Sequence, residues 1–140
     1  MIAPLLRRLE RSPHWLHGLL CRLGAAGVFW RSGRTKVDGW SIGETTFDLF
    51  RDEYRVPLLP PDLAAVAATV AEHLFPALLV IGLASRLSAA ALLGMTVVIQ
   101  VFVYPGSWPD HLLWASALLY VSLRGPGAVS LDHLIRRRYN

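Results

Sequence analysis

Residues 87–109 read LSAAALLGMTVVIQVFVYPGSWP, and no side chain in this stretch is charged. A helix that crosses the hydrocarbon core of a bilayer needs about 20 mostly apolar residues. The helices of a soluble bundle differ from this stretch, because each of them carries a polar face. The sequence therefore predicts a membrane-spanning helix over residues 87–105, with Tyr104, Trp108 and Trp114 as aromatic anchors at the membrane boundary.

Three weaker apolar stretches predict further spans. They cover residues 14–30, 63–85 and 111–123. The composition agrees, since 54% of the 140 residues are hydrophobic and 17% are charged, against roughly 45–50% and about 25% in soluble domains. We therefore expect an all-α fold, in which residues 1–140 form one domain built as an integral-membrane four-helix bundle.

The basic residues predict how this bundle lies in the membrane, because positive side chains collect on the cytoplasmic side. With four spans, one side would carry Arg7, Arg8, Arg11, Arg86, Arg124, Arg136, Arg137 and Arg138. The link over residues 105–110 has no lysine or arginine, so we expect both termini in the cytoplasm. The net charge of +4 then suits a membrane surface, and we expect no nucleic-acid partner.

Two segments outside the spans predict short helices on the membrane surface. Phe47, Phe50 and Tyr54 recur at helical spacing among charged residues of the first link. A basic segment over residues 130–138 follows a Gly-Pro-Gly break after the fourth span. Helices with apolar and charged faces lie in the membrane interface, so we expect one interfacial helix in the first link and one near the C-terminus.

Two ionisable groups lie inside predicted spans, Arg22 in the first and Glu72 in the second. A charge at the bilayer centre costs about 2.5–3.5 kcal/mol, so such groups usually find a partner. The two spans run antiparallel and place both groups at similar depth, which predicts an Arg22–Glu72 ion pair. This pair either fixes the helix register or handles a ligand or proton. Pro76 leaves the carbonyl of Glu72 without its helical N–H, which favours a polar cavity beside Glu72 and His73.

A second set of polar groups is expected nearer the outer face. Gln100 lies in the third span, His111 begins the fourth, and Lys36 belongs to a basic rim after the first. We expect Lys36 and His111 at the membrane boundary, solvated by water and available to an anion or a quinone headgroup. The alternative is that Lys36 only snorkels to the interface and His111 only starts a helix. No metal site is expected, because no second histidine clearly shares the depth of His111.

The order of these residues resembles the DoxX family of small bacterial membrane proteins with four spans. The first span gives Arg22, Gly24, Phe29, Gly33 and Lys36, similar to the family's Arg…Gly…Phe…Gly…Lys pattern. The second gives Ala71-Glu72, Pro76 and Gly82-Leu83-Ala84-Ser85-Arg86, similar to the family's glutamate-bearing helix and Gly-Leu-x-Thr-Arg turn, with Ser85 in place of threonine. The ending is also similar, with Tyr104-Pro105, Trp108, His111, Trp114, Gly125-Pro126-Gly127 and Ser130-Leu131-Asp132.

The resemblance implies a four-helix bundle in the bacterial inner membrane, and it carries the family's key positions onto Arg22, Lys36, Glu72 and His111. The family takes its name from relatives in a thiosulfate:quinone oxidoreductase, and some members are linked to membrane complexes that manage oxidative or thiol stress. The resemblance thus implies a subunit or anchor of a redox-linked membrane complex, and it leaves open whether the chain is itself catalytic.

We expect a quinone, a thiosulfate-like anion or another small ligand near the polar residues. The candidate site residues are Arg22, Lys36, Glu72, His73, Gln100 and His111. Membrane lipid and partner subunits of a redox complex are the expected partners. Two alternatives remain at this point: a transporter-like protein for small solutes or lipids without redox chemistry, and a structural scaffold.

Overall fold

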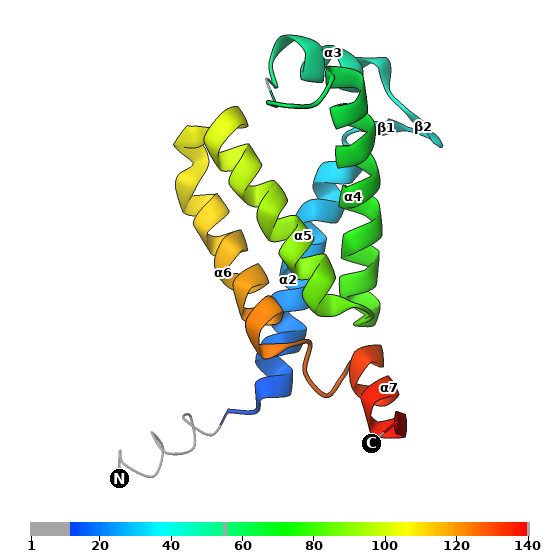
Figure 1. The fold of residues 1–140 in the computed structure, drawn as a ribbon, viewed down its shortest axis with the longest axis vertical. Coiled ribbons are helices and arrows are strands. Elements are labelled where there is room, and N and C mark those ends of the chain that lie inside the picture. Colours follow the sequence, from blue (N-terminus) through cyan, green and yellow to red (C-terminus); the bar gives the residue numbers. More distant parts are fainter. Residues whose placement is uncertain (1–11, 55, 140) are drawn as a thin grey trace.

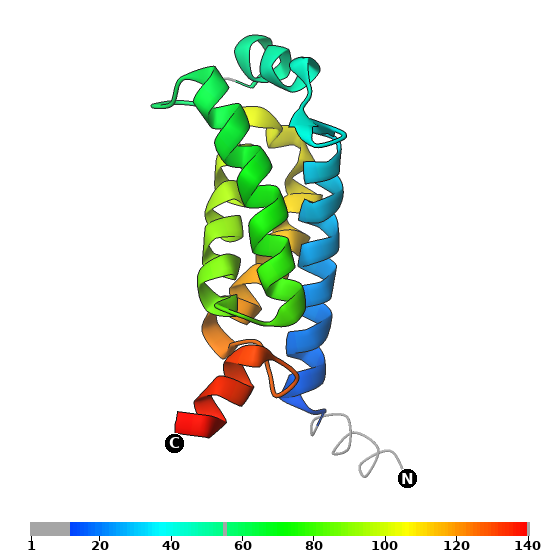
Figure 2. The same cartoon turned by 90° about the vertical axis from the view of Figure 1, so that its right-hand side faces the viewer.

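The computed structural model describes residues 12–54 and 56–139. Its long helices are α2 (His14–Arg34), α4 (Pro61–Ile81), α5 (Ser85–Val98) and α6 (Trp108–Arg124). α2 and α5 each pack against both α4 and α6, so these helices surround a common core (Figures 1 and 2). The predicted basic residues Arg7, Arg8 and Arg11 lie outside the described residues.

Shorter elements lie at the two ends of the long helices. Strands β1 (Val37–Asp38) and β2 (Ser41–Ile42) form an antiparallel hairpin, and α3 (Glu44–Asp52) follows it. The π-helix η1 (Ile99–Val103) continues α5, and the 3₁₀ turn η2 (Pro105–Ser107) leads into α6. Figure 1 places α3 at one end and α7 (Leu131–Tyr139) at the other. These are called the α3 end and the α7 end below.

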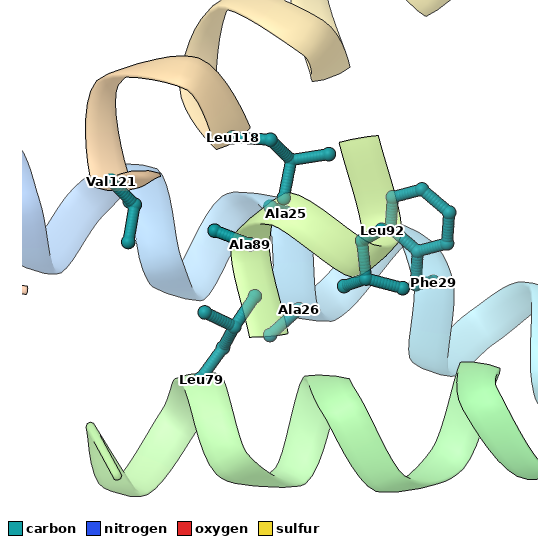
Figure 3. Close-up of a cluster of buried hydrophobic side chains, with 8 residues drawn as sticks. All are labelled: Ala25, Ala26, Phe29, Leu79, Ala89, Leu92, Leu118 and Val121. Carbon is teal, nitrogen blue, oxygen red and sulfur yellow. The ribbon is translucent and has the colours of Figure 1, made fainter. Parts of the chain in front are cut away.

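The core between the long helices is small and tightly packed. Phe29, Leu79, Leu92, Leu118 and Val121 are at most 1% exposed, and Figure 3 shows them meeting from all the long helices. Alanines 25, 26 and 89 complete the cluster. Small residues let helix backbones approach closely, which is how helices in lipid gain contact energy.

Two of the helices in the described part of the chain are long and apolar enough to cross a membrane. They are Pro61–Ile81 and Ser85–Val103, each with a mean hydropathy of 1.8. Both present large apolar side chains outward, for example Val70 and Leu74 on α4 and Val97 on α5. Contact between these apolar side chains and lipid chains costs little free energy, whereas their exposure to water is unfavourable.

The helix ends differ from the predicted spans for local reasons. α4 stops at Ile81 because Gly82 adopts a left-handed conformation (φ 73°), and its N–H bonds to Leu78 O. α2 runs on through Gly33 to Arg34. α3 ends at Asp52, so Tyr54 lies beyond the helix that its spacing predicts. Hydropathy marks the residues that suit lipid, while the helix ends depend on turn geometry.

Candidate functional site

A buried ion pair lies at the α3 end, where α2 ends against the middle of α4. Lys36 Nζ lies 2.7 Å from Oε2 of Glu72, and the two side chains are 11% and 3% exposed. Ser32 donates from Oγ to Oε1 of Glu72 at 3.2 Å, and Lys36 Nζ lies 3.2 Å from the same Oγ. The pair is nearly out of water, so each charge depends on the other.

Gly33 explains how α2 and α4 come close enough to form this pair. A β-carbon on Gly33 would lie 2.9 Å from the ring of His73 and 3.1 Å from Cβ of Glu72. Lys36 is then held from its other side, because its carbonyl accepts from Gly43 N at 3.1 Å and from Thr46 Oγ1 at 2.9 Å. The hairpin and the start of α3 therefore fix the backbone of Lys36.

The predicted Arg22–Glu72 ion pair is wrong. Since Gly33 is the residue of α2 that faces Glu72, Arg22 lies about 16 Å away along the helix, at 1.5 Å per residue. The prediction matched the midpoints of two apolar stretches, whereas α2 and α4 are displaced along their common axis. Glu72 pairs with a residue after α2, and Arg22 lies at the α7 end.

Arg22 is 1% exposed and bonds to carbonyl oxygens. Its Nε donates to Leu79 O at 2.8 Å and its Nη2 to Val80 O at 3.1 Å. Its Nη1 donates to Pro126 O at 2.8 Å and to Val129 O at 2.7 Å. The last carbonyls of a helix lack helical partners and form its negative end. Arg22 therefore caps α4 and ties the loop after α6 to it, which is a structural role.

His111 and Gln100 form a second polar contact at the α3 end. Gln100 Nε2 donates to Pro105 O at 2.8 Å, which turns its Oε1 toward His111. His111 Nδ1 lies 2.6 Å from that oxygen, so Nδ1 carries the proton and Nε2 is left for another partner. Gln100 belongs to the π-helix η1, a widened helical turn that is frequent at functional sites.

A cavity of about 380 Å³ joins these groups. Its polar lining consists of Ser32, Lys36, Tyr54, Glu72, Tyr104 and His111. Apolar residues of α2, α3, the loop between α3 and α4, α4, α5, η1 and α6 form the remaining wall. On α4 the wall is made of small side chains, with Ala64, Ala67, Ala68 and Ala71 on one helix face. The cavity therefore combines a polar end with room along an alanine face.

The structure brings Lys36, Glu72 and His111 together at this cavity and leaves other predicted residues outside it. Arg22, His73 and Gln100 are absent from the lining. Gln100 bonds to His111 and so orients a side chain of the lining. His73 Nδ1 donates to Thr69 O at 2.7 Å, and its ring packs on the edge of Trp30. Lys36 and His111 are 8% and 4% exposed, so the expectation that water solvates them at the boundary is wrong.

Sequence reasoning missed a tyrosine pair at the cavity. The Tyr54 and Tyr104 hydroxyls lie 2.7 Å apart, and Tyr104 also donates to Oε1 of Glu53 at 3.3 Å. Burial and the bond to Tyr104 raise the pKa of Tyr54, so its hydroxyl stays protonated at neutral pH. Both residues read as ordinary membrane-interface aromatics, and only the packing of η1 against the first link brings them together.

The arrangement suits binding of an uncharged polar group more than an ion. The cationic side chain in the lining, Lys36, already neutralises Glu72. Lys36 Nζ offers N–H donors, while Nε2 of His111 and the hydroxyl oxygens of Tyr54 and Tyr104 offer acceptors, because Tyr104 donates to Glu53 and Tyr54 to Tyr104. A neutral ligand with a carbonyl or hydroxyl group bonds to such atoms without adding net charge. Within residues 12–54 and 56–139, no three histidine, cysteine or carboxylate side chains gather into a metal site.

Comparison with known proteins identifies the family of the chain. A model of the DoxX family matches residues 17–105. An uncharacterized protein of Haemophilus influenzae is 31% identical over 134 aligned residues, which cover 86% of this chain and 84% of that protein. No solved structure matches. The family match spans both Lys36 and Glu72, and the chain therefore belongs to the DoxX family of membrane proteins.

Proposed function

We propose that this protein binds an uncharged, lipid-soluble molecule of the quinone class in the cavity at the α3 end, as a subunit or anchor of a redox-linked membrane complex. The observation that carries the proposal is the Lys36–Glu72 ion pair at the polar end of an otherwise apolar cavity. This assignment places the ligand site at Lys36, Glu72 and His111, with Arg22 supporting the fold.

The net charge of the site favours a quinone over a thiosulfate-like anion. A dianion next to Lys36 would also lie next to the carboxylate of Glu72, and like charges in a water-poor site repel strongly. A quinone carbonyl accepts hydrogen bonds while remaining uncharged. Lys36 Nζ is a suitable N–H donor to such a carbonyl, because its side chain is buried and lines the cavity. His111 donates from Nδ1 to Gln100 and leaves Nε2 as an acceptor, which suits the hydroxyl of the reduced quinone.

Size and lining also fit such a ligand. Small-molecule sites usually enclose about 300–1,000 Å³ and are mostly apolar with a few polar groups. The cavity of about 380 Å³ accommodates a ring and the first part of an apolar tail. A bound quinone would supply the electron chemistry, while the residues of this chain bind, orient and hydrogen-bond it. Electrons would then pass to or from a partner subunit.

The same proposal includes a location and a topology. Four spans, formed by α2, α4, α5–η1 and α6, would lie in the bacterial inner membrane with the α7 end in the cytoplasm, and α3 and α7 would lie in the two interfaces. The α7 end carries Arg86, Arg124 and the arginines of α7, whereas residues 105–110 have no lysine or arginine. The first link, residues 31–62, also carries five lysines and arginines, together with six acidic residues. Support for a cytoplasmic α7 end therefore comes from the net positive charge of that end and from its contrast with residues 105–110.

Reporter fusions test the topology. A reporter that is active only in the cytoplasm should work after Tyr139 and fail after Ser107. The reverse pattern, or activity at both positions, would overturn the proposed orientation.

Extraction of bound molecules tests the ligand. The full chain is purified from membranes in mild detergent, and the extract is analysed by mass spectrometry for quinones and for co-purifying subunits. We expect stoichiometric quinone with the wild type and a loss of at least ten-fold with Glu72→Gln. In Glu72→Gln the ammonium of Lys36 is freed, so thiosulfate binding should rise. A wild type that binds thiosulfate and no quinone would refute the assignment, and a phospholipid in place of quinone would favour a lipid-binding role without redox chemistry.

A further inference from the structure

A second, smaller cavity lies at the α7 end. It has a volume of about 260 Å³ and is lined by His14, Tyr120, Arg124, Gly125 and Gly127. It is separate from the cavity of the proposed quinone site and shares no lining residue with it. Its residues come from the start of α2, the end of α6 and the loop that follows α6.

A second guanidinium group lies beside this cavity. A β-carbon on Gly125 would stand 3.4 Å from both Nε and Nη2 of Arg86. Gly125, with φ 86°, therefore leaves room for Arg86 to lie against the loop. The ion pairs within residues 12–54 and 56–139 involve Lys36 and Arg51. In this described part of the chain, neither Arg86 nor Arg124 has a carboxylate within 4.0 Å.

The backbone of this cavity is held in place from inside the protein. Arg22 donates to Pro126 O and Val129 O. A β-carbon on Gly127 would lie 2.8 Å from Cα of Trp15, and one on Gly18 would lie 2.8 Å from Pro126 O. The loop thus packs directly on the backbone of α2, which gives the cavity a fixed shape before any ligand binds.

Two guanidinium groups beside one cavity, neither with an acidic partner among the residues that the structure describes, are suited to a phosphate group. Their planar N–H donors match phosphate oxygens in pairs, and the Tyr120 hydroxyl is a further donor on the cavity wall. Leu87 and Leu123, the chain neighbours of Arg86 and Arg124, are 69% and 66% exposed. These two exposed apolar side chains lie next to the cations in the sequence, so they can contact acyl chains attached to the phosphate.

We propose that Arg86 and Arg124 bind the phosphodiester headgroup of an anionic membrane lipid at this cavity. The site does not depend on the quinone proposal, because it uses other residues at the opposite end of the long helices. A free phosphate ion offers the same headgroup chemistry without the acyl chains, so the test compares the two.

The test titrates the purified full chain in detergent with phosphatidylglycerol, with phosphatidylcholine and with inorganic phosphate. The variant Arg86→Gln/Arg124→Gln removes the two guanidinium groups. The matched control Arg136→Gln/Arg137→Gln removes the same charge from α7 outside the cavity. All four arginines are exposed, and the melting temperature of each variant without lipid verifies that it folds.

We expect the wild type and the control to bind phosphatidylglycerol with similar affinity and to prefer it over phosphatidylcholine. The Arg86/Arg124 variant should bind phosphatidylglycerol roughly ten- to a hundred-fold more weakly, as expected for lost charge-assisted hydrogen bonds. Equal weakening in the control would show a general charge effect and overturn the site. Competition by inorganic phosphate at concentrations similar to those of the lipid would overturn the lipid assignment and leave a free-phosphate site.

Discussion

The two ends of the molecule both bury a cation, and they use it differently. At the α7 end, Arg22 donates to carbonyls of α4 and of the loop after α6, which leaves no donor directed into a ligand cavity. At the α3 end, Lys36 and Glu72 bond to each other and to Ser32, and both line a cavity. A buried cation that bonds to backbone carbonyls supports the fold, whereas a charged pair that lines a cavity can contact a ligand.

At the α7 end, charged side chains cap both helix ends that meet in the turn between α4 and α5. Arg22 caps the negative end of α4, and Asp132 accepts from Ala84 N and Ser85 N at 2.8 Å each, at the positive end of α5. Opposite charges thus cap the two helix ends that meet at one turn. At the α3 end, the π-helix η1 and the tyrosine pair lie where the chain passes from α5 to α6.

The largest predicted effect is the loss of Arg22. Arg22→Met removes the side-chain donor to the carbonyls of Leu79, Val80, Pro126 and Val129, of which Leu79 O keeps its bond from Gly82 N. Each buried acceptor that loses its partner costs about 1–3 kcal/mol, so we expect about 5 kcal/mol of destabilisation. Thermal unfolding in detergent measures it. Arg22→Lys should rescue little of the loss, because one ammonium does not replace the planar fork. A stable Arg22→Met variant would show that the α7 end is not held in this way.

The next effect is the loss of one partner of the ion pair at the α3 end. Glu72→Leu leaves Lys36 as an unpaired buried charge, which should cost about 3 kcal/mol. Lys36→Met/Glu72→Leu should recover most of that loss, since no charge is then stranded. The comparison uses a double-mutant cycle, with Arg22→Met/Glu72→Leu as the control pair. We expect the changes in unfolding free energy to be non-additive for Lys36 and Glu72 and additive for Arg22 and Glu72. The opposite result would support the Arg22–Glu72 ion pair expected from the sequence.

A smaller effect is expected at Gly82, which belongs to the α7 end. Gly82→Ala places a β-carbon 2.5 Å from Cβ of Ser130 and imposes a side chain on a left-handed residue with φ 73°. We expect about 2 kcal/mol of destabilisation. Gly94→Ala is the control, because a β-carbon there meets nothing within 4 Å. Equal melting temperatures for the two variants would contradict the close packing of this turn.

The smallest effect is expected at the exposed ion pair between Arg51 and Asp62. Arg51 Nε and Nη2 lie 2.8 and 2.9 Å from the Asp62 carboxylate, and both side chains are about half exposed. Exposed pairs contribute little because water competes for both charges. Arg51→Gln should leave the melting temperature and ligand binding unchanged. A clear drop in stability would mean that α3 is held to α4 by charge more than by the packing of Phe50.

The helices were predictable from sequence, and the contacts between them were not. Apolar stretches, two of them interrupted by a charged side chain, indicated the long helices, and the spacing of Phe47 and Phe50 indicated α3. The family resemblance selected Arg22, Lys36, Glu72 and His111, of which the last three meet at one cavity and Arg22 does not line it. Composition does not specify the displacement of α2 along α4, because that displacement depends on where Gly33 permits close approach. For the same reason Arg22 was paired with the wrong residue.

The tyrosine pair shows a second limit of sequence reasoning. Tyr54 and Tyr104 are separated by 50 residues, and each one alone reads as an interfacial aromatic side chain. Their contact depends on the π-helix η1, which changes the direction of the chain after Val98. Hydropathy does not distinguish a π-helical turn from an α-helical one, since both bury and expose similar apolar residues.

The central claim is that the cavity at the α3 end holds a ligand, and filling that cavity tests it most directly. Ala71 lines the cavity on α4, whereas Ala77 on the same helix is exposed outside it. The measurement is the binding of a short-chain quinone to wild type, Ala71→Phe and Ala77→Phe in lipid discs, with the melting temperature of each variant as a folding control. The account predicts that the wild type and Ala77→Phe bind alike and that Ala71→Phe loses at least ten-fold in affinity. Equal binding by all three folded proteins would contradict it.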